Sequence, residues 1–453
     1  MAFVRPRQLA LSALNTLEDS LQFPNRYLEQ AFRQASHLNE RDRAFTIHLV
    51  QGVLRWRLRL DWIIQQTVRF PFKKIRYPVL NILRLALYQV LFMNRVPESA
   101  AVNEAVKQVK IIESNHVARF VNGILRNICR EKQQIRFPDK ERDSVHFLSV
   151  FHSYPVWLVE KWIKEMGIDS AEGMLAAGNR IPSLVLRTNT MKIDRKNLMR
   201  RLESEGVRGK TASFSPEGIT VEGLRCPIDQ LNAFREGLFQ VQSESAQICS
   251  HLLLPKSGER ILDVCAGLGG KSTHMAQCMN NRGEILGLDT NRYRLLRLAK
   301  SARRLGMNCV YAVAADAGRP PFRMSGRLFD RILIDAPCSA LGTISRHPDI
   351  KWVRNEQDIR RLSLLQKKIL RRAAPLLRNG GRMLYVTCTT SPEENDEVIA
   401  EFLEKNRKMA LIDLRNHVPE WGLPLIDDHG FFRTFPHIHG MDGFFGALLA
   451  RDG

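Results

Sequence analysis

The sequence predicts a multidomain protein with an all-α amino-terminal domain, a small α+β middle module and a carboxyl-terminal α/β domain. Its 453 residues suffice for two to four domains. Apolar residues recur at helical spacing almost throughout the first 134 residues, whereas short apolar strands alternate with helices after residue 242. With 44% hydrophobic and 25% charged residues, the composition is that of a globular protein and excludes a largely disordered chain.

The amino-terminal helical domain, which we place at residues 1–140, carries much of the chain's positive charge. The whole chain has 68 Lys and Arg against 47 Asp and Glu, a net charge of +21, and residues 1–143 alone hold 24 against 13. Solvated helix faces would explain such charges. An excess of this size also favours a polyanionic partner, nucleic acid before a membrane surface. Both interpretations of the basic helices stay open.

The middle module, at residues 145–238, begins with a helical stretch and continues as a mixture of strands and helices. We expect helices at Tyr154–Met166 and Arg195–Glu205, and strands at Leu184–Asn189, near Gly218–Val221 and near Leu238–Val241. A small α+β unit accounts for this pattern.

The carboxyl-terminal domain, at residues 239–453, alternates strands with helices. Strands are expected at Arg260–Val264, Glu284–Asp289, Cys309–Ala314, Asp330–Ile334 and Gly381–Val386, and helices at Ser272–Met279, Arg292–Leu305 and Gln357–Leu377. This order implies right-handed crossovers and a parallel sheet covered on both faces. Ligands of such sheets bind beyond the carboxyl ends of the strands, where the chemistry should be sought.

A glycine-rich turn follows the first of these strands. It comprises Cys265, Ala266, Gly267, Leu268, Gly269, Gly270 and Lys271. Glycines allow a ligand to approach the backbone, and the next helix presents free N–H groups. The turn matches neither the dinucleotide pattern nor the P-loop pattern, so by itself it could be a plain strand-to-helix connection.

Acidic residues follow four successive strands. Asp263 ends the first strand, Asp289 the second, Asp316 follows the third, and Asp335 ends the fourth. A carboxylate after the second strand of a doubly wound sheet can bind the hydroxyls of a ribose. Any one of these acids could be a surface residue, but four in succession indicate a ligand site.

Two cysteines, Cys338 and Cys388, follow the fourth and fifth strands of the predicted sheet. Two thiols at one ligand-binding edge suggest nucleophilic chemistry. A metal site is the rival interpretation, but no histidine pair at ligand spacing accompanies them, so we expect no metal. Cysteines such as Cys249, Cys278 and Cys309 are interpreted as inert core residues.

Neither a signal peptide nor a membrane span is expected. The longest apolar runs are interrupted by polar residues and stay below the roughly 20 residues that a span needs. Eight cysteines without regular spacing do not suggest a disulfide framework. We therefore expect a cytoplasmic protein without membrane contact, and a monomer.

These residues resemble the RNA cytosine-5 methyltransferases, and within them the bacterial RsmB/Sun (Fmu) type that modifies 16S ribosomal RNA. The runs RHPDIKW at Arg346–Trp352 and RTFPHIHGMDGFF at Arg433–Phe445 are specific to that type, while Asn103–Val106 and Phe120–Arg126 resemble the NusB pattern. The resemblance covers essentially the whole chain. It implies a NusB-like helical RNA-binding domain in front and a Rossmann-like, S-adenosylmethionine-dependent methyltransferase domain behind.

The resemblance also implies a role for each site residue. The turn Cys265–Lys271 would bind S-adenosylmethionine, with Asp289 on the ribose and Asp316 near the adenine. Asp335, between cofactor and base, would help to hold the cytosine. Cys388, in a T-C motif, would be the nucleophile and Cys338, in a P-C motif, would help to release the product. We expect the neighbouring Lys271 to favour the reactive thiolate.

The chain departs from the family pattern at a few positions. The usual C-A-A-P-G-G-K-T is changed at Gly267, Leu268 and Ser272, and Ala340-Leu341 replaces a usual G-T after Cys338-Ser339. The catalytic positions are intact, so activity is expected, and the altered turn bears on cofactor affinity.

The implied activity is methylation of carbon 5 of a cytosine in 16S ribosomal RNA, either free or in a partly assembled small subunit. A transfer RNA cytosine-5 methyltransferase would use the same chemistry. DNA cytosine methyltransferases carry their nucleophile in the P-C motif, which would be Cys338. A non-catalytic RNA-binding or antitermination-like factor would need only the basic helices.

Overall fold

The computed structural model describes residues 5–20, 24–35, 38–224, 226–322 and 328–452. The chain forms two compact units, one of residues 1–180 with 346–354 and the other of residues 181–345 with 355–453. The short run 346–354 therefore belongs to the helical unit, although it lies within the carboxyl-terminal part of the chain. The division into domains at 1–140, 145–238 and 239–453 remains a prediction.

The first unit is all-helical among its described residues, as predicted. Asparagine and serine side chains cap two of its helices, since Asn39 accepts from the N–H of Asp42 and Ser114 from that of Val117. The helices are α1 (Pro6–Ser20), α2 (Pro24–Gln34), α3 (Glu40–Thr67), α4 (Tyr77–Phe92), α5 (Glu98–Ile112), α6 (Asn115–Glu131), α7 (Ser144–His152), α8 (Val156–Met166), α9 (Ile168–Gly178) and α15 (Ile350–Val353).

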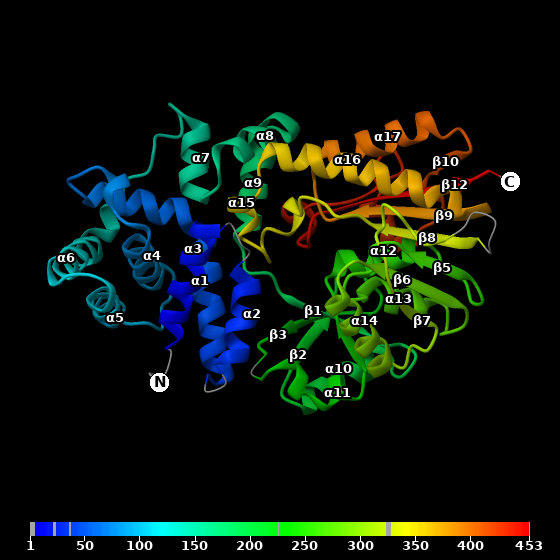
Figure 1. The fold of residues 1–453 in the computed structure, drawn as a ribbon, viewed down its shortest axis with the longest axis horizontal. Helices are drawn as coiled ribbons and strands as arrows, with labels where there is room; N and C mark the ends of the chain where they lie inside the picture. The colour runs from blue at the N-terminus through cyan, green and yellow to red at the C-terminus, as the bar shows by residue number, and fades with distance from the viewer. Residues whose placement is uncertain (1–4, 21–23, 36–37, 225, 323–327, 453) are drawn as a thin grey trace. The chain divides into compact units, whose positions relative to one another are not determined.

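Helices α1 and α3–α6 bury one apolar core, which explains the helical periodicity of the sequence. Leu49 and Val50 of α3, Ile82 and Leu83 of α4, and Val109 of α5 are fully buried in it. Helix α4 runs through the centre of this group (Figure 1), and nearly all of its side chains from Val79 to Gln89 are buried. A helix that is apolar on all sides is a core helix, not an amphipathic surface helix.

Helix α3 is broken at Trp56, whose backbone angles, φ −116° and ψ 17°, are not helical. In a regular helix the carbonyl of Leu54 would accept from the N–H of Leu58. Here the indole Nε1 of Trp352 donates to the Leu54 carbonyl at 2.7 Å, and the N–H of Leu58 donates to Ser153 Oγ at 2.9 Å. The segment 346–354 thus satisfies backbone groups that the break releases.

Lys351 occupies the same break and is only 1% exposed. Its ammonium donates to the carbonyls of Arg55 at 3.0 Å and Ser153 at 3.1 Å, and to Asn179 Oδ1 at 2.7 Å. Its Nζ also lies 3.5 Å from the centroid of the Tyr154 ring. Burial lowers the pKa of Lys351 well below its ordinary value. This side chain joins α3, the α7–α8 connection and the end of α9.

The second unit contains a small sheet with strand order β2-β3-β1-β4, in which all pairs are antiparallel. Its elements are β1 (Leu184–Thr188), α10 (Arg195–Ser204), β2 (Arg208–Thr211), β3 (Gly218–Glu222), α11 (Asn232–Arg235) and β4 (Phe239–Val241). The α+β character was predicted, but β2 was not. Its sequence, RGKT, is polar and largely exposed, so it lacks the apolar alternation that identifies a strand.

The larger sheet of the second unit has the order β10-β12-β9-β8-β5-β6-β7, and β11 pairs with β12. Its strands are β5 (Arg260–Asp263), β6 (Glu284–Asp289), β7 (Val310–Ala314), β8 (Phe329–Asp335), β9 (Leu377–Thr387), β10 (Met409–Ile412), β11 (Phe432–Thr434) and β12 (Phe444–Arg451). The five strands β5–β9 are parallel, as predicted.

The sheet also contains strands that were not predicted, and these make it mixed. Strand β12 runs antiparallel to β9, β10 and β11. Only the short helix α18 (Pro436–His439) separates β11 from β12. A connection this short cannot carry the chain back across the sheet, so the two strands pair antiparallel.

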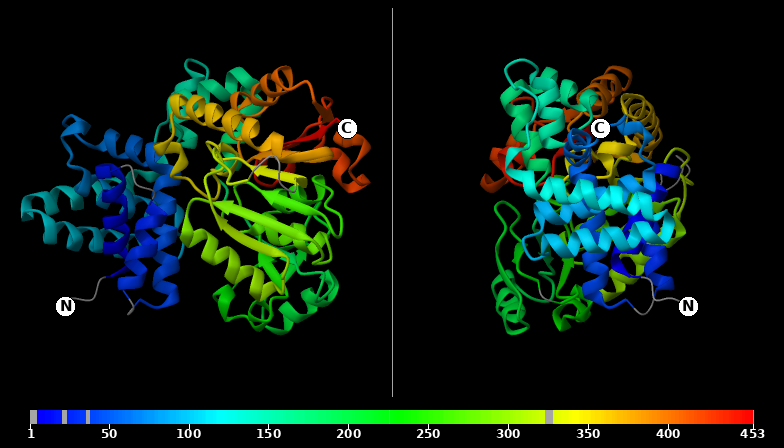
Figure 2. Two further views of the ribbon diagram at one scale, coloured as in Figure 1. Left: turned by 45° about the vertical axis from the view of Figure 1, so that its right-hand side comes forward. Right: turned by 90° about the vertical axis from the view of Figure 1, so that its left-hand side faces the viewer.

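Helices cover both faces of the larger sheet, as predicted. On one face, α12 (Glu244–Leu252), α13 (Gly270–Cys278) and the end of α14 (Arg292–Leu305) pack in one core with Ile261. On the other, α16 (Glu356–Ala373) and α17 (Asp396–Lys405) pack in a second core with the next residue, Leu262. Both views in Figure 2 have α16 and α17 along the same side of the sheet. No helix in the described part of the chain is long and apolar enough to span a membrane.

Candidate active site

The carboxyl ends of the parallel strands bring the four predicted acids around one cysteine. Burial raises the pKa of Cys265 well above its ordinary value, and the negative charges of Asp263, Asp335, Asp289 and Asp316 raise it further. Each acid follows a different strand of the sheet, β5, β8, β6 or β7. The topology therefore assembles one acidic site from positions spread over about 70 residues of sequence.

The glycine-rich turn after β5 leaves space that a ligand can occupy. Gly267 and Gly269 have φ angles of +55° and +79°, which favour glycine. A Cβ on Gly269 would lie 2.5 Å from Leu298 Cγ, so only glycine fits between turn and helix α14, whereas a Cβ on Gly267 would meet nothing within 4 Å. The departure from the family pattern at Gly267 thus faces open space, and Leu268 beside it is exposed.

The acids after β6 and β7 are held by backbone turns. Asp289 Oδ1 accepts from the N–H of Asn291 at 2.7 Å, and Asp316 Oδ1 from the N–H of Gly318 at 2.8 Å. Their carboxylates are oriented without a buried salt bridge among the described residues; the Arg294 guanidinium lies 3.7 Å from Asp289. Oriented carboxylates at this edge suit the hydroxyls and amino groups of a nucleoside.

Lys271 and Asp335 form an ion pair at the centre of the site. Lys271 Nζ donates to Asp335 Oδ2 at 2.6 Å and lies 5.3 Å from the centroid of the Phe444 ring. Burial alone would lower the pKa of Lys271, but the negative charge of Asp335 outweighs burial and raises it. Lys271 is thus a fixed positive charge directly after the glycine-rich turn.

The two thiols predicted at this edge lie next to each other, with 3.3 Å between Cys338 Sγ and Cys388 Sγ. Cys338 is buried and Cys388 is half-buried. The hydrogen bond with Cys388 raises the pKa of Cys338 well above its ordinary value, and burial and the charge of Glu394 raise it further. The two sulfurs are within hydrogen-bonding distance, and either thiol can be the donor.

Sequence reasoning assigned no role to Glu394, yet it connects the two cysteine loops. Its carboxylate accepts from the N–H of Ser339 at 2.9 Å, from the Ser339 hydroxyl, and from Gln366 Nε2 at 2.9 Å. Ser339 Oγ in turn lies 2.8 Å from Thr389 Oγ1. Ser339 follows Cys338 and Thr389 follows Cys388, so this network fixes both thiols. The only sequence signal was the short run Glu393-Glu394 after the second cysteine.

The closing DGFF run packs against the loop that carries Cys338. The N–H of Gly443 donates to the carbonyl of Gly342 at 2.8 Å, and a Cβ on Gly342 would lie 2.0 Å from the Gly443 carbonyl oxygen. In the same loop Ala340 has a φ of +63°, a conformation that favours the glycine of the family pattern. Glycine at 342 and 443 is a steric requirement of this contact.

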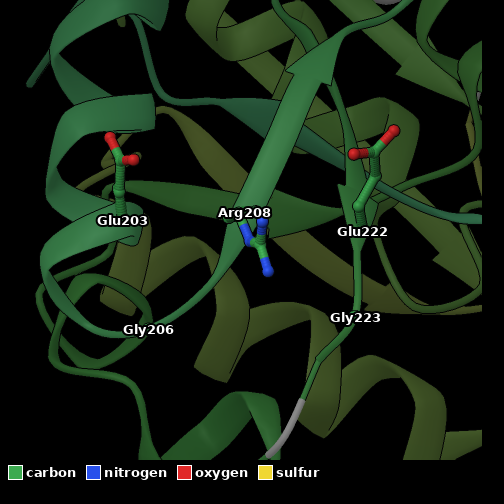
Figure 3. Close-up of a pocket in the computed structure, with 5 residues that line it drawn as sticks. All are labelled: Glu203, Gly206, Arg208, Glu222 and Gly223. Carbon is green, nitrogen blue, oxygen red and sulfur yellow. The ribbon is translucent and has the colours of Figure 1, made fainter.

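A hollow of about 580 Å³ in the small module lies apart from these residues. Glu203 of α10, Arg208 of β2 and Glu222 of β3 line it together with Gly206 and Gly223 (Figure 3). It contains none of the thiols or acids described above. We assign it no role.

The doubly wound sheet, the glycine-rich turn and the acids after successive strands define the chain as an S-adenosylmethionine-dependent methyltransferase. Comparison with known families agrees. Residues 250–450 match the family described as 16S rRNA methyltransferase RsmB/F, residues 4–130 the NusB family, and residues 154–229 the ferredoxin-like domain of RsmF/B-like methyltransferases.

Two curated relatives match along nearly their whole lengths. The "Probable ribosomal RNA small subunit methyltransferase B" of Bacillus subtilis is 35% identical over 448 residues, covering 99% of both chains. The ribosomal RNA small subunit methyltransferase B of Proteus mirabilis is 34% identical over 416 residues, covering 92% of both. The chain belongs to the RsmB/F methyltransferase family, whose methyl donor is S-adenosylmethionine.

Solved structures share the fold. The crystal structure of PH0851 has a TM-score of 0.80 at 26% identity and covers 99% of both chains. A methyltransferase homologue from Pyrococcus horikoshii has a TM-score of 0.59 at 28% identity, covering 69% of this chain and 99% of its own.

Proposed function

We propose that this chain methylates carbon 5 of a specific cytosine in 16S ribosomal RNA through a covalent bond between Cys388 and the base. The observation that carries the proposal is the 3.3 Å separation of Cys338 Sγ and Cys388 Sγ beside the Lys271–Asp335 pair. Family membership supports a ribosomal RNA substrate. The basic front domain supports a polyanionic partner.

The covalent step answers a chemical need. Carbon 5 of cytosine is too weak a nucleophile to take a methyl group directly, so the Cys388 thiolate first adds to carbon 6 and its electron pair forms the sulfur–carbon bond. The electrons of the 5,6 double bond then make carbon 5 nucleophilic. Covalent catalysis of this kind divides one hard step into easier ones.

The donor, S-adenosylmethionine, supplies a methyl group on a positively charged sulfur. We assign the turn Cys265–Lys271 and the carboxylates of Asp289 and Asp316 to holding it, with the ribose on Asp289 and the adenine near Asp316. Bound there, S-adenosylmethionine would supply its methyl group to the activated carbon 5, and the sulfur would keep the electrons of the methyl–sulfur bond.

Asp335 and Lys271 are assigned to the base. A carboxylate can accept from the exocyclic amino group of cytosine, which uracil lacks. Lys271 holds Asp335 in place through the 2.6 Å ion pair. Its positive charge also favours the Cys388 thiolate.

Cys338 is assigned to product release. The proton on carbon 5 passes to a general base, its electron pair restores the double bond, and the bond between carbon 6 and Cys388 breaks to return the thiolate. Cys338 carries the sulfur adjacent to the departing one, 3.3 Å away. Removing Cys338 should therefore slow release more than addition.

The base must be out of its stack to react. Carbons 5 and 6 of a cytosine in a helix are covered by neighbouring bases, so the enzyme acts on an unpaired cytosine or extrudes one. The basic helical unit and the small module bind the RNA around the target base, through its shape and its phosphates.

The test is methyl transfer from labelled S-adenosylmethionine to unmodified 16S ribosomal RNA. Wild type should label carbon 5 of one cytosine, Cys388→Ala should be inactive, and Cys338→Ala should accumulate a protein–RNA adduct that survives denaturation. An inactive Cys338→Ala with an adduct in Cys388→Ala would exchange the two roles, as in DNA cytosine methyltransferases.

Substrate controls separate the other candidates. Transfer RNA should remain unlabelled, and labelling of it in place of 16S RNA would move the substrate but keep the chemistry. Free RNA and partly assembled subunits should be compared side by side. RNA binding without S-adenosylmethionine binding by wild type would leave a non-catalytic factor and overturn the proposal.

A further inference from the structure

A cluster of metal-binding side chains lies at the end of helix α13 and has no part in the proposed reaction. His274 and Cys278 are four residues apart on α13 and therefore share one face of the helix. His251 comes from α12, which packs against α13. One ligand atom of each of these three residues lies within 4.8 Å of the other two.

A carboxylate joins the cluster from the small module. Glu217, in the turn before β3, has its Oε2 3.0 Å from His251 Nε2 and 3.9 Å from His274 Nε2. The carboxylate oxygen thus faces both imidazoles.

His274 indicates that a ligand completes this cluster. The side chain is fully buried, and its Nε2 has no hydrogen-bond partner among the described residues. A neutral imidazole carries a lone pair on one of its ring nitrogens, which can bind a metal ion. A buried ring nitrogen with no partner is costly unless something binds to it.

We propose that His251, His274, Cys278 and Glu217 bind a zinc ion that fastens the small module to helices α12 and α13. Imidazole nitrogens, thiolate sulfurs and carboxylate oxygens are each zinc ligands, and zinc is usually bound by four of them. Cys278 and His251 are half-buried, so an ion has access from solvent. From the sequence we expected no metal, because no histidine pair accompanies Cys338 and Cys388. That argument did not consider Cys278.

The charges of the neighbourhood are compatible with zinc. Zinc coordinates a thiolate, so binding of the ion would displace the proton of the Cys278 thiol. The buried cation nearby is Arg187, which donates to the carbonyl of Gly270 at 2.7 Å and to Thr273 Oγ1 at 3.1 Å. A dication bound by one thiolate and one carboxylate forms a cluster with no net charge, so the occupied site would not carry a positive charge beside Arg187.

The experiment uses the full-length protein, freed of metal and titrated with zinc or cobalt(II). Wild type should bind one equivalent of zinc, measured by mass spectrometry of metals after desalting, and its melting temperature should rise with zinc and fall with chelator. Cobalt(II) should produce a thiolate-to-cobalt charge-transfer band in the near ultraviolet. Cys278→Ala should lose that band, and His274→Gln should weaken metal binding by about tenfold or more.

Matched variants exclude other thiols. Cys309→Ala removes a buried cysteine of the same core but outside the cluster, and Cys388→Ala removes a sulfur of the catalytic pair; both should retain the band and the stoichiometry. A band lost in Cys388→Ala and kept in Cys278→Ala would move the metal to the catalytic thiols and overturn the proposal. So would a wild type that binds neither ion and whose melting temperature does not respond to zinc, a result independent of how any variant folds.

Discussion

The ammonium of Lys351 donates to the main-chain carbonyl of Arg55 at 3.0 Å, although 296 positions separate the two residues in the sequence. The RHPDIKW run, which the resemblance marked as specific to the family, is thereby part of the helical unit. Its lysine and tryptophan replace the hydrogen bonds that helix α3 loses at Trp56. The run therefore stabilises the broken part of α3 by supplying hydrogen bonds that the helix lacks there. In the sequence it follows the loop that carries Cys338.

Replacing Lys351 by methionine should destabilise the helical unit. Methionine fills similar volume but leaves the carbonyls of Arg55 and Ser153 and the amide oxygen of Asn179 without this donor, which costs about 3 kcal/mol of unfolding free energy in all. Urea unfolding followed by tryptophan fluorescence would measure the loss. As a control, Lys164→Met at an exposed position on α8 of the same unit should change stability little. An equal loss of stability in this variant would contradict the role of Lys351 in stabilising α3.

Little of this arrangement could be predicted from local sequence. The helices of the first unit follow from their apolar spacing, and helix α14 has the bounds that were expected, Arg292–Leu305. Nothing near residue 351 indicates that its partners lie at residues 55, 153 and 179, because a buried lysine and a solvated one look alike in a sequence. The break at Trp56 also has no signal in the sequence, since helix α3 continues on both sides of it.

Glu394 should act as a positioning residue for the two thiols. Glu394→Gln keeps an oxygen acceptor for the N–H of Ser339 and the amide of Gln366, but it places an amide donor against the Ser339 hydroxyl, which already donates to Glu394. We expect kcat for methyl transfer to fall by about tenfold or more with little change in the Kd of S-adenosylmethionine, since about 1.4 kcal/mol of lost orientation suffices for that factor. The nearby exposed Glu397→Gln is the control, and a Kd that changes as much as kcat would indicate general unfolding of the site.

Asp263 predicts a dependence of stability on pH. Burial raises the pKa of this carboxyl to about 7 from 3.8, and the Ser272 hydroxyl donates to its Oδ2 at 2.6 Å. The folded protein keeps the proton up to pH about 7, whereas the unfolded chain releases it near 3.8, so the stabilisation is complete below 3.8 and is lost as pH rises through 7.

The measurement compares wild type with Asp263→Asn in urea unfolding from pH about 5 to about 8. The difference between the two free energies of unfolding should change by a few kcal/mol across this range, with wild type losing stability relative to the variant as pH rises. A difference that stays constant with pH would show that Asp263 is ionised in the folded protein.

Ala340 is a strained residue whose replacement should stabilise the protein. Its φ of +63° costs an alanine about 1 kcal/mol relative to glycine, the residue that the family pattern has there. Ala340→Gly should raise the free energy of unfolding by about 0.5 to 1 kcal/mol, whereas Ala302→Gly in the last turn of helix α14, where the methyl group is buried, should lower it by a similar amount or more. Differential scanning calorimetry would show the opposite shifts in Tm.

The site itself was more predictable than its supports. Asp335, Cys338 and Cys388 follow strands, and parallel strands bring their carboxyl ends to one edge, so the pattern alone places these residues close together. Their supports, Ser339, Glu394 and Gly443, act through hydrogen bonds and contacts made only in the folded chain. A buried carboxylate that accepts three hydrogen bonds and one that faces solvent have the same sequence signature.

The basic helical unit should supply RNA affinity through its exposed lysines. Lys73 and Lys74 lie in the exposed turn before helix α4, and Lys74 borders a shallow hollow with His116 and Phe120. A Lys73→Ala/Lys74→Ala variant should bind 16S RNA more weakly and lower the salt slope of binding by about 2, with S-adenosylmethionine affinity unchanged.

Deleting residues 1–140 would be a poorer test, because it removes the partners of Lys351 and Trp352. The control, Arg407→Ala/Lys408→Ala, removes two exposed charges of the other unit and should leave the slope nearly unchanged. Equal losses of RNA affinity in both variants would mean that net charge, not this surface, governs binding.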